Sequence, residues 1–262
     1  MDLQLKDKRV LITGGSKGIG LAVAKAFAAE GAHLVLCART LAPLVKAGKE
    51  LEKEYNTEVD CQQTDVVDAI SVTVLVEHIK TTYGTLDIYV NNAGQGSEET
   101  IAEAPDERWQ YYWDLHVMAA VRITRGIIPL MNSGGAMLFN SSICAKQPLS
   151  YEPIYNTTKA ALSMFSKCLS SELIPKDIRV NTINPGLVLT PDWYNTATSL
   201  GEKEGITADQ YLDRLAKKLT PIGRFGTPEE IANFFVFLCS PMASYSVGST
   251  YYVDGGWLKV VQ

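Results

Sequence analysis

The fold is decided by Thr13-Gly14-Gly15-Ser16-Lys17-Gly18-Ile19-Gly20, a glycine-rich stretch near the start of the chain. An apolar run precedes this stretch, and a segment with apolar residues at helical spacing follows it. Gly14, Gly18 and Gly20 permit a tight turn, a close approach of the backbone and close packing of the helix. Free N–H groups at the start of that helix suit a pyrophosphate. This strand–turn–helix context predicts a dinucleotide site that also includes Ser16 and Ile19.

Short β-rich runs alternate with helical stretches along the whole chain. We predict strands at residues 10–13, 33–38, 58–64, 86–91, 136–140, 178–184 and 250–253. We predict helices at residues 21–30, 41–55, 69–83, 106–131, 154–174 and 228–239. Near-continuous apolar strands separated by helices indicate a parallel sheet with helices on both faces. Residues 1–262 are therefore expected to form one α/β domain, a doubly wound, Rossmann-type sheet of seven strands. Residues 187–222 show no clear pattern and are expected to form a functional loop segment.

Composition excludes several classes of protein. The 262 residues are 46% hydrophobic and 20% charged, with a net charge of −5, so the basic face that nucleic acid requires is not expected. The first ten residues lack the apolar region of a secretory signal, and no apolar run approaches the ~18 residues of a membrane span. Five cysteines without a CxxC pair favour buried thiols over a metal or disulfide framework. We expect a cytoplasmic protein without a metal site.

Tyr155 and Lys159 lie one helical turn apart, with Ser142 thirteen residues before the tyrosine. Side chains at this spacing share a helix face, with Cβ atoms roughly 5–6 Å apart. The pKa of a free phenol is about 10, and a neighbouring cation lowers it by stabilising the phenolate. The pattern favours Tyr155 as a general acid/base, although such a short spacing also arises by chance.

The end of the second predicted strand indicates which dinucleotide binds. Dinucleotide sites usually carry an acidic residue there to hold the ribose hydroxyls, but this chain has Ala38 followed by Arg39. Without a carboxylate to repel it, a ribose 2′-phosphate can be approached by both Lys17 and Arg39. NADP(H) is therefore predicted. The alternatives are that the two cations are solvated surface charges, or that the protein is an NAD-dependent alcohol dehydrogenase.

Two further motifs follow predicted strands, at the edge where open α/β sheets bind ligands. Asp65-Val66 follows the third strand, and Asp65 either accepts a hydrogen bond from adenine or caps the next helix. Asn91-Asn92-Ala93-Gly94 ends the fourth strand, and Ala93-Gly94 lets the backbone run close to adenine and ribose. These positions extend the predicted cofactor site through Asp65, Val66, Asn92, Ala93 and Gly94.

Together these motifs resemble the short-chain dehydrogenase/reductase family over residues 6–257, including Val253-Asp254-Gly255-Gly256. The resemblance implies an oxidoreductase that interconverts a ketone and a secondary alcohol. It implies that Tyr155 exchanges a proton with the substrate oxygen, that Ser142 donates a hydrogen bond to that oxygen, and that Lys159 holds the nicotinamide ribose. It places Pro185, Gly186, Val188 and Thr190 at the nicotinamide. A non-catalytic cofactor sensor on the same fold is the rival, disfavoured because Tyr155 and Lys159 are both present.

His116 departs from the pattern of this family, which has an asparagine seven residues after the tryptophan that is Trp109 here. In the family that asparagine completes a proton relay to the lysine. An imidazole can also donate and accept hydrogen bonds, so His116 is expected either to keep the relay or to add a pH-sensitive element. The alternative is a hydrogen-bonded helix histidine whose backbone alone serves the relay.

Substrate-binding residues are expected around the predicted catalytic group, and they are Gln95, Ser142, Cys144, Gln147, Trp193 and Tyr194. Mostly apolar walls with two glutamines suit a neutral, fairly hydrophobic carbonyl or alcohol. The aromatic residues are equally well read as core or interface residues. The resemblance further implies a homotetramer that pairs the helices at 106–131 and 154–174, with a second interface formed by residues 231–239 and the last strand.

Overall fold

The fold is a parallel α/β sheet, described by a computed structural model for residues 1–97 and 99–260. Within those residues, seven strands pair in parallel in the order β3-β2-β1-β4-β5-β6-β7. They are β1 (Arg9–Thr13), β2 (His33–Ala38), β3 (Val59–Gln63), β4 (Leu86–Asn91), β5 (Met131–Asn140), β6 (Arg179–Pro185) and β7 (Thr250–Val253). The order reverses between β1 and β4, as in a doubly wound sheet. The predicted fold class is confirmed.

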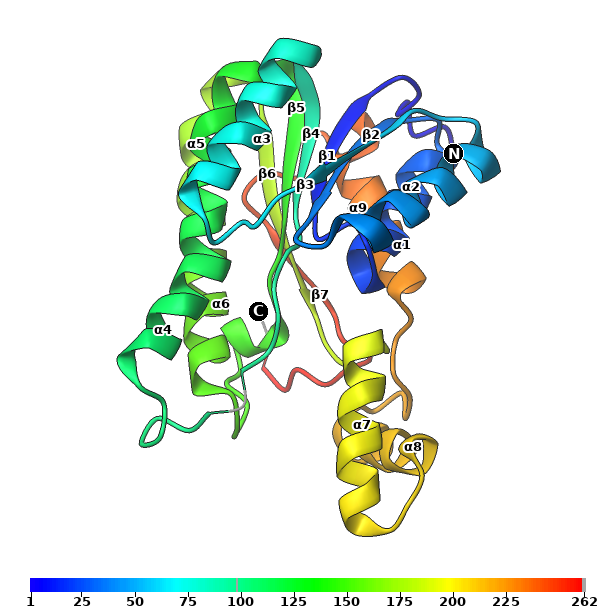
Figure 1. Ribbon diagram of the computed structural model, residues 1–262, viewed down its shortest axis with the longest axis vertical. Helices are drawn as coiled ribbons and strands as arrows, with labels where there is room; N and C mark the ends of the chain where they lie inside the picture. The colour runs from blue at the N-terminus through cyan, green and yellow to red at the C-terminus, as the bar shows by residue number, and fades with distance from the viewer. Residues whose placement is uncertain (98, 261–262) are drawn as a thin grey trace.

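Helices cover both faces of the sheet (Figure 1). One face carries α1 (Gly18–Ala29), α2 (Leu41–Tyr55) and α9 (Pro228–Cys239). The other carries α3 (Ala69–Thr82), α4 (Asp106–Trp113), α5 (Ala119–Ile127) and α6 (Pro153–Leu173). Alternate strand residues feed the two cores, since Val10 and Ile12 pack with α1 whereas Leu11 packs on the opposite side.

The predicted helix at residues 106–131 is interrupted where its sequence reads DLHVM. A π-helical turn, Asp114–Met118, joins α4 to α5, and His116 lies within it. A short 3₁₀ turn then ends the helical run, and β5 begins at Met131 rather than at residue 136. Single π-helical turns inside α-helices are frequent at functional sites.

The segment at residues 187–222 is helical, which corrects the expectation of a loop. It contains α7 (Pro191–Glu204) and α8 (Ala208–Leu219). The Thr190 hydroxyl caps α7 by accepting a hydrogen bond from the Trp193 N–H, and Thr207 with Gln210 forms a capping box on α8. This helical pair stands apart from the sheet, beyond the carboxyl ends of the strands (Figure 1).

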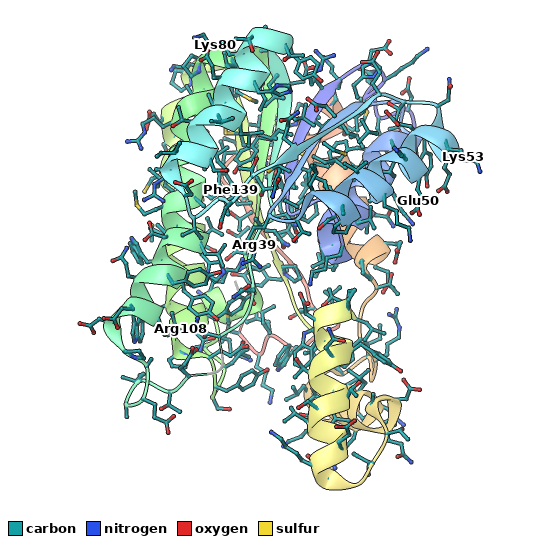
Figure 2. The ribbon with its side chains drawn as sticks, in the orientation of Figure 1. Arg39, Glu50, Lys53, Lys80, Arg108 and Phe139 are labelled. Atoms are coloured by element: carbon teal, nitrogen blue, oxygen red, sulfur yellow. The ribbon has the colours of Figure 1, made fainter. Side chains whose placement is uncertain are left out.

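Charged side chains lie on the outer faces of the helices. Glu50 and Lys53 are exposed on α2, and Lys80 is exposed near the end of α3 (Figure 2). Phe139, by contrast, is fully buried in the sheet. Within the described part of the chain, no helix has the combination of length and apolar character that crossing a bilayer requires.

Candidate active site

A cavity of about 960 Å³ opens at the carboxyl ends of the strands, between the sheet and the α7–α8 pair. Most of the residues predicted for catalysis or binding line it: Gly14, Ser16, Lys17, Gly18, Ile19, Gly20, Arg39, Val66, Asn92, Ala93, Gly94, Gln95, Ser142, Tyr155, Lys159, Pro185, Gly186, Val188, Thr190 and Trp193. The topology therefore brings together residues from both halves of the chain. This is the crevice in which open α/β sheets bind ligands.

The glycine-rich turn has the shape that a dinucleotide cradle needs. Gly14 and Gly18 have φ values of +69° and +57°, which a residue with a Cβ rarely adopts. A Cβ on Gly20 would lie 2.1 Å from the Gly14 carbonyl oxygen and 2.5 Å from Asn92 Nδ2. No side chain in the described residues caps α1 at Lys17, so the N–H groups of its first turn remain available to an anion. These residues fit a pyrophosphate.

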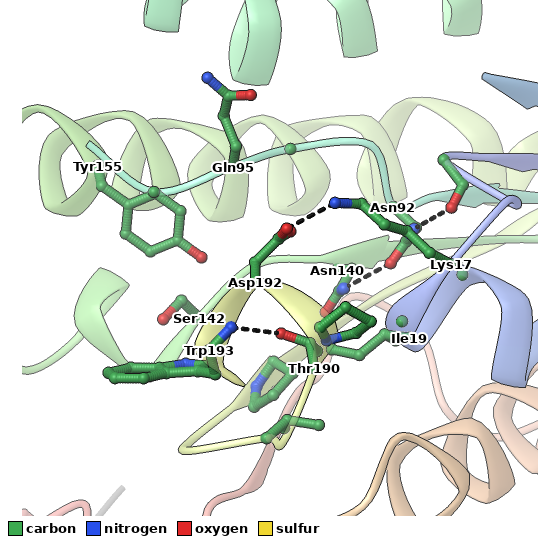
Figure 3. Close-up of a pocket in the computed structure, with 18 of the residues that line it drawn as sticks. Lys17, Ile19, Asn92, Gln95, Asn140, Ser142, Tyr155, Thr190, Asp192 and Trp193 are labelled. Atoms are coloured by element: carbon green, nitrogen blue, oxygen red, sulfur yellow. Dashed lines mark hydrogen bonds and ion pairs between the residues drawn. The ribbon is translucent and has the colours of Figure 1, made fainter. Parts of the chain in front are cut away.

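Two cations stand at the rim of the cavity, beside Ala38. Lys17 Nζ lies 2.5 Å from Asp192 Oδ1, and both side chains are largely exposed (Figure 3). Arg39 donates hydrogen bonds to the Tyr111 hydroxyl at 3.3 Å and to Gln95 Oε1 at 3.4 Å. The cations are thus held by weak, solvent-accessible contacts that a phosphate can replace.

Ser142 and Tyr155 face one another across the inner part of the cavity. Ser142 follows β5, Tyr155 lies in the first turn of α6, and both hydroxyls point into the same space (Figure 3). Burial raises the pKa of Tyr155 well above its usual value, and the nearby Cys144 and Glu152 add to this shift, while a hydrogen bond to Ser142 opposes it. The lowered pKa expected from the sequence is therefore not found, because desolvation of the phenol outweighs the other effects. The tyrosine is held in its acid form.

Lys159 is a buried cation in the wall of the cavity. Its side chain is 3% exposed, and its ammonium donates a hydrogen bond to the Asn140 carbonyl oxygen at 2.9 Å. Burial lowers the pKa of Lys159 to about 8. The ammonium lies 5.5 Å from the centre of the Tyr155 ring, so the two groups are close together, as the sequence predicted.

His116 lies behind the cavity wall and is 1% exposed. Its Nδ1 lies 2.8 Å from the Thr158 hydroxyl, which donates to the Ile154 carbonyl oxygen, while its Nε2 accepts the Gln95 N–H at 3.4 Å. These partners assign the proton to Nδ1. Burial, together with Lys159, lowers the pKa of His116 well below its usual value. The ring is therefore neutral near pH 7, which disfavours the pH-sensitive alternative.

Several predicted residues lie elsewhere. Asp65 does not line the cavity, and its carboxylate accepts the Val67 N–H at 3.1 Å, the local turn role that was its alternative. Cys144 is buried beneath the wall. Gln147 Oε1 accepts the backbone N–H of Lys259, and Tyr194 is 46% exposed on α7. The structure thus separates these four side chains from the cavity.

Two carboxylates at the cavity were missed by the sequence analysis. Glu152 precedes α6 and adopts the left-handed conformation, with φ of 59°. Asp192 occupies the first turn of α7, where acidic residues are favoured by the helix dipole. The Thr190-Pro191 pair was a helix-start signal that would have revealed α7 and with it Asp192.

Comparison with known proteins assigns the family. The family described as Enoyl-(Acyl carrier protein) reductase matches residues 14–258. The 3-oxoacyl-[acyl-carrier-protein] reductase of Chlamydia muridarum is 32% identical over 258 residues, which cover 98% of this chain and 99% of that protein. The chain belongs to the short-chain dehydrogenase/reductase family. The family predicted from the motifs is confirmed.

Solved structures match the chain over almost all of its length. L-sorbose reductase from Gluconobacter frateurii, complexed with NADPH and L-sorbose, is 54% identical with a TM-score of 0.98, and all of both chains is covered. An NADPH-bound short chain oxidoreductase from Pseudomonas aeruginosa, described as containing an atypical catalytic center, is 31% identical with a TM-score of 0.89. That match covers 97% of this chain and 98% of the other.

Proposed function

We propose that the chain reduces the keto group of a ketose, or of a similar polyhydroxy ketone, to a secondary alcohol. It is an NADP(H)-dependent oxidoreductase, in agreement with the sequence prediction and with the 54% identity to L-sorbose reductase. The observation that carries the substrate proposal is the Glu152 carboxylate, which shares a cavity with Ser142 and Tyr155. A carboxylate accepts hydrogen bonds from hydroxyl groups, whereas it disfavours the hydrophobic substrate expected from the sequence.

The mechanism follows from the positions of the side chains. The glycine-rich turn would hold the cofactor pyrophosphate, Lys17 and Arg39 would reach the 2′-phosphate, and Val188 with Thr190 would contact the nicotinamide, since all of these residues line the cavity. The bound cofactor supplies the reducing equivalent. Tyr155, protonated at neutral pH, donates its proton to the substrate oxygen, and the Ser142 hydroxyl donates a hydrogen bond to the same atom. Lys159 supplies positive charge beside the phenol as that proton leaves.

The neutral His116 supports this arrangement from behind. It joins the Gln95 backbone on one wall to Thr158 on α6, one residue from Lys159. The Asn140 carbonyl oxygen directs the ammonium of that lysine. We assign His116 to positioning, since its ring nitrogens bond to Gln95 and Thr158 and its side chain does not line the cavity.

The proposal is tested by NADPH oxidation with L-sorbose, other ketoses and an apolar ketone of similar size. Tyr155→Phe should keep the fold and NADPH binding while losing roughly 10²–10⁴ in kcat. Glu152→Gln keeps the size of the side chain but removes its charge, so kcat/KM for the ketose should fall about 10–100-fold. The apolar ketone should be unaffected by Glu152→Gln. Faster turnover of the apolar ketone than of every ketose would refute the substrate class.

We propose a homotetramer as the assembled form. Apolar side chains are exposed on the helices that the family resemblance assigns to the interfaces, with Met164 on α6 64% exposed and Phe234 and Phe237 on α9 about 40% exposed. Tyr245, shortly after α9, is fully exposed. Light scattering should report four chains, and Phe237→Glu should shift the mass downwards. A monomer throughout the micromolar range would contradict the proposal.

We also propose a cytoplasmic location. The five cysteines are free thiols, and Cys37, Cys144 and Cys239 are buried, as suits a reducing compartment. Burial raises the pKa of Cys37 and Cys239 to about 12, so these thiols are unreactive. Fractionation of cells that produce the native chain should recover the activity with cytoplasmic markers, and recovery from an exported fraction would contradict it.

A further inference from the structure

Asn140, the last residue of β5, carries a polar group that the mechanism above does not use. Side chains alternate along the strand, so Leu138 packs with α1 and α9 while Phe139 packs on the opposite face. The Asn140 side chain therefore lies on the same side as Leu138, towards the glycine-rich turn. Asn140 lines the cavity although it is 7% exposed.

A chain of hydrogen bonds fixes the orientation of its carboxamide. Asn92 Nδ2 donates to the carbonyl oxygens of Thr13 and Gly14, at 3.0 and 3.3 Å, so the Asn92 amide nitrogen faces the glycine-rich turn. Asn92 Oδ1 then faces Asn140 and accepts a hydrogen bond from its Nδ2 at 2.8 Å (Figure 3). Turning the Asn140 amide over would place two acceptors against each other.

This orientation leaves the Asn140 carboxamide oxygen as a buried acceptor. Within the described residues it has no hydrogen-bond partner. Most buried polar atoms in proteins have one, so an exception calls for an explanation. The backbone carbonyl of the same residue accepts a hydrogen bond from the Lys159 ammonium, so Asn140 contacts both the catalytic lysine and, through Asn92, the glycine-rich turn.

We propose that Asn140 is a further cofactor-binding residue, whose carboxamide oxygen accepts a hydrogen bond from an O–H or N–H of the nicotinamide riboside half of NADP(H). This inference rests on the proposed role of the cavity as the cofactor site. The residue then has three linked functions. Its amide nitrogen steadies Asn92, its carbonyl oxygen directs Lys159, and its amide oxygen completes the hydrogen bonding of the bound cofactor.

The test compares two ligands by calorimetry, without turnover. NADPH contains the nicotinamide riboside half, whereas 2′,5′-ADP lacks it. Asn140→Leu keeps the volume and removes both the acceptor and the hydrogen bond to Asn92, and loss of the acceptor should raise Kd for NADPH about tenfold. Kd for 2′,5′-ADP should change by less than about twofold, which is under half a kcal/mol, because this ligand lacks the half that would bond to Asn140. Asn140→Ala should give the same contrast if the leucine variant folds poorly.

Asn184→Leu is the matched control. Asn184 lies on the neighbouring β6, is also buried, and also has an amide oxygen without a partner, but it does not line the cavity. The Asn184→Leu variant should change the free energy of unfolding, but it should not change Kd for NADPH relative to Kd for 2′,5′-ADP. Equal weakening of NADPH and 2′,5′-ADP by the Asn140 variants would show action through Asn92 alone and overturn the proposal. Unchanged NADPH affinity with a raised substrate KM would place the donor on the substrate and also overturn it. Failure of wild type to bind either ligand would instead refute the cofactor site itself.

Discussion

At the scale of single residues, the candidate active site combines a buried cation with a partly buried phenol. Water is the better solvent for both charged forms, so burial raises the pKa of Tyr155 and lowers that of Lys159. The phenol therefore remains an acid, while the lysine stays mostly protonated up to a pH of about 8. Burying the Lys159 ammonium lowers the free energy of unfolding, and the protein keeps this cost because the reaction requires the charge.

Lys159→Met should make the protein more stable while abolishing activity. The pKa falls from 10.5 to about 8, which at 1.36 kcal/mol per unit corresponds to about 3 kcal/mol. Below pH 8 the lysine is protonated in both the folded and the unfolded chain, so the whole of this destabilisation applies. Between the two pKa values the unfolded chain binds more protons, so the stability of wild type rises with pH and the advantage of methionine shrinks. Urea unfolding of both proteins at pH values of about 7 and about 9.5 should show the gap narrow by roughly 2 kcal/mol.

The exposed Lys146 provides the control for this measurement, since Lys146→Met should leave the free energy of unfolding unchanged within about 0.5 kcal/mol. A Lys159→Met variant that is less stable than wild type at neutral pH would show that the Asn140 hydrogen bond outweighs desolvation.

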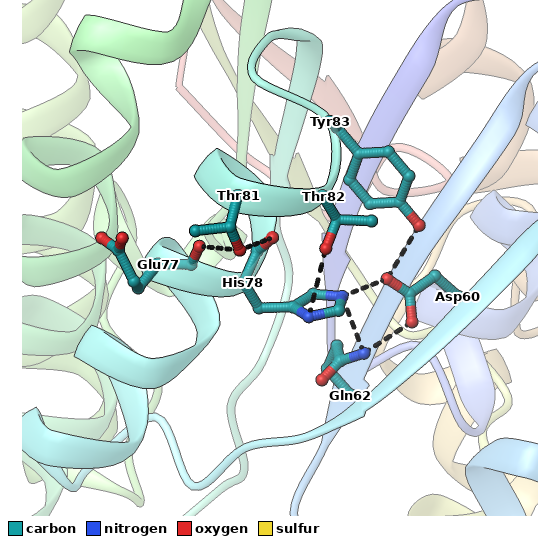
Figure 4. A network of polar contacts seen from close by, with 7 residues as sticks. All are labelled: Asp60, Gln62, Glu77, His78, Thr81, Thr82 and Tyr83. Carbon is teal, nitrogen blue, oxygen red and sulfur yellow. Dashed lines mark hydrogen bonds and ion pairs between the residues drawn. The ribbon is translucent and has the colours of Figure 1, made fainter.

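At the scale of elements, a polar cluster ties α3 to the edge strand β3 (Figure 4). Asp60 on β3 lies 2.6 Å from His78 Nε2, and accepts hydrogen bonds from Gln62 at 2.6 Å and from the Tyr83 hydroxyl at 2.9 Å. Burial favours a higher pKa for Asp60, but the hydrogen bonds from His78, Gln62 and Tyr83 together lower it. The Arg9 guanidinium stacks 3.9 Å from the Tyr83 ring and extends the cluster to β1.

Asp60→Asn should destabilise the protein by about 1–2 kcal/mol at neutral pH, a value that allows for partial screening by solvent. Because the folded-state pKa of Asp60 is lowered, its contribution is present above the unfolded pKa of about 3.9 and is lost as pH falls through the folded value. Denaturant unfolding from neutral to acid pH should show the two proteins converge. Glu77→Gln, at an exposed pair on the same helix, is the control and should have almost no effect.

The elements differed in how well the sequence predicted them. The seven strands and the long helices were found because buried apolar runs and helical spacing are local signals. The π-helical turn at His116 was missed because it keeps the apolar spacing of a continuous helix closely enough to hide one extra residue. The helices α7 and α8 were missed because their caps were overlooked, and Tyr194 was consequently placed in the cavity although it lies on the outer side of α7.

The site residues divide in the same way. Ser142, Tyr155 and Lys159 form a recognisable pattern along the chain. Glu152 and Asn140 gain their roles from three-dimensional placement: the first from a left-handed backbone conformation, the second from a neighbour 48 residues away. Nothing in the local sequence marks either.

At the scale of the whole molecule, cofactor binding joins the two halves of the sheet and should stabilise the entire fold. A ligand at about one hundred times its Kd adds about 2.7 kcal/mol, or roughly 5–10 °C for a chain of this size. At equal concentrations NADPH should raise the Tm more than NADH does, because Lys17 and Arg39 stand at the rim without a competing acid at Ala38.

The double variant Ala38→Asp with Arg39→Leu should reverse this order, since the new carboxylate attracts ribose hydroxyls and repels the 2′-phosphate. Thermal unfolding with each cofactor, and kcat/KM at matched ionic strength, measure the change. A wild type that responds more to NADH, or a double variant whose preference does not move, would show that the two cations are solvated surface charges.

The α7–α8 pair packs into a third, small apolar core, in which Ala197 and Leu212 of the helices join Leu187 and Trp257 from outside the pair, separate from the two cores of the sheet. Because of this separation, side chains of the helical pair can be exchanged without repacking either core of the sheet. Substitutions in the helical pair alter one wall of the cavity, and Asp192 is a point at which they also reach the glycine-rich turn, through Lys17. If the proposed function is right, substitutions on the cavity side of these two helices should change which substrate fits, with less effect on the affinity for the cofactor.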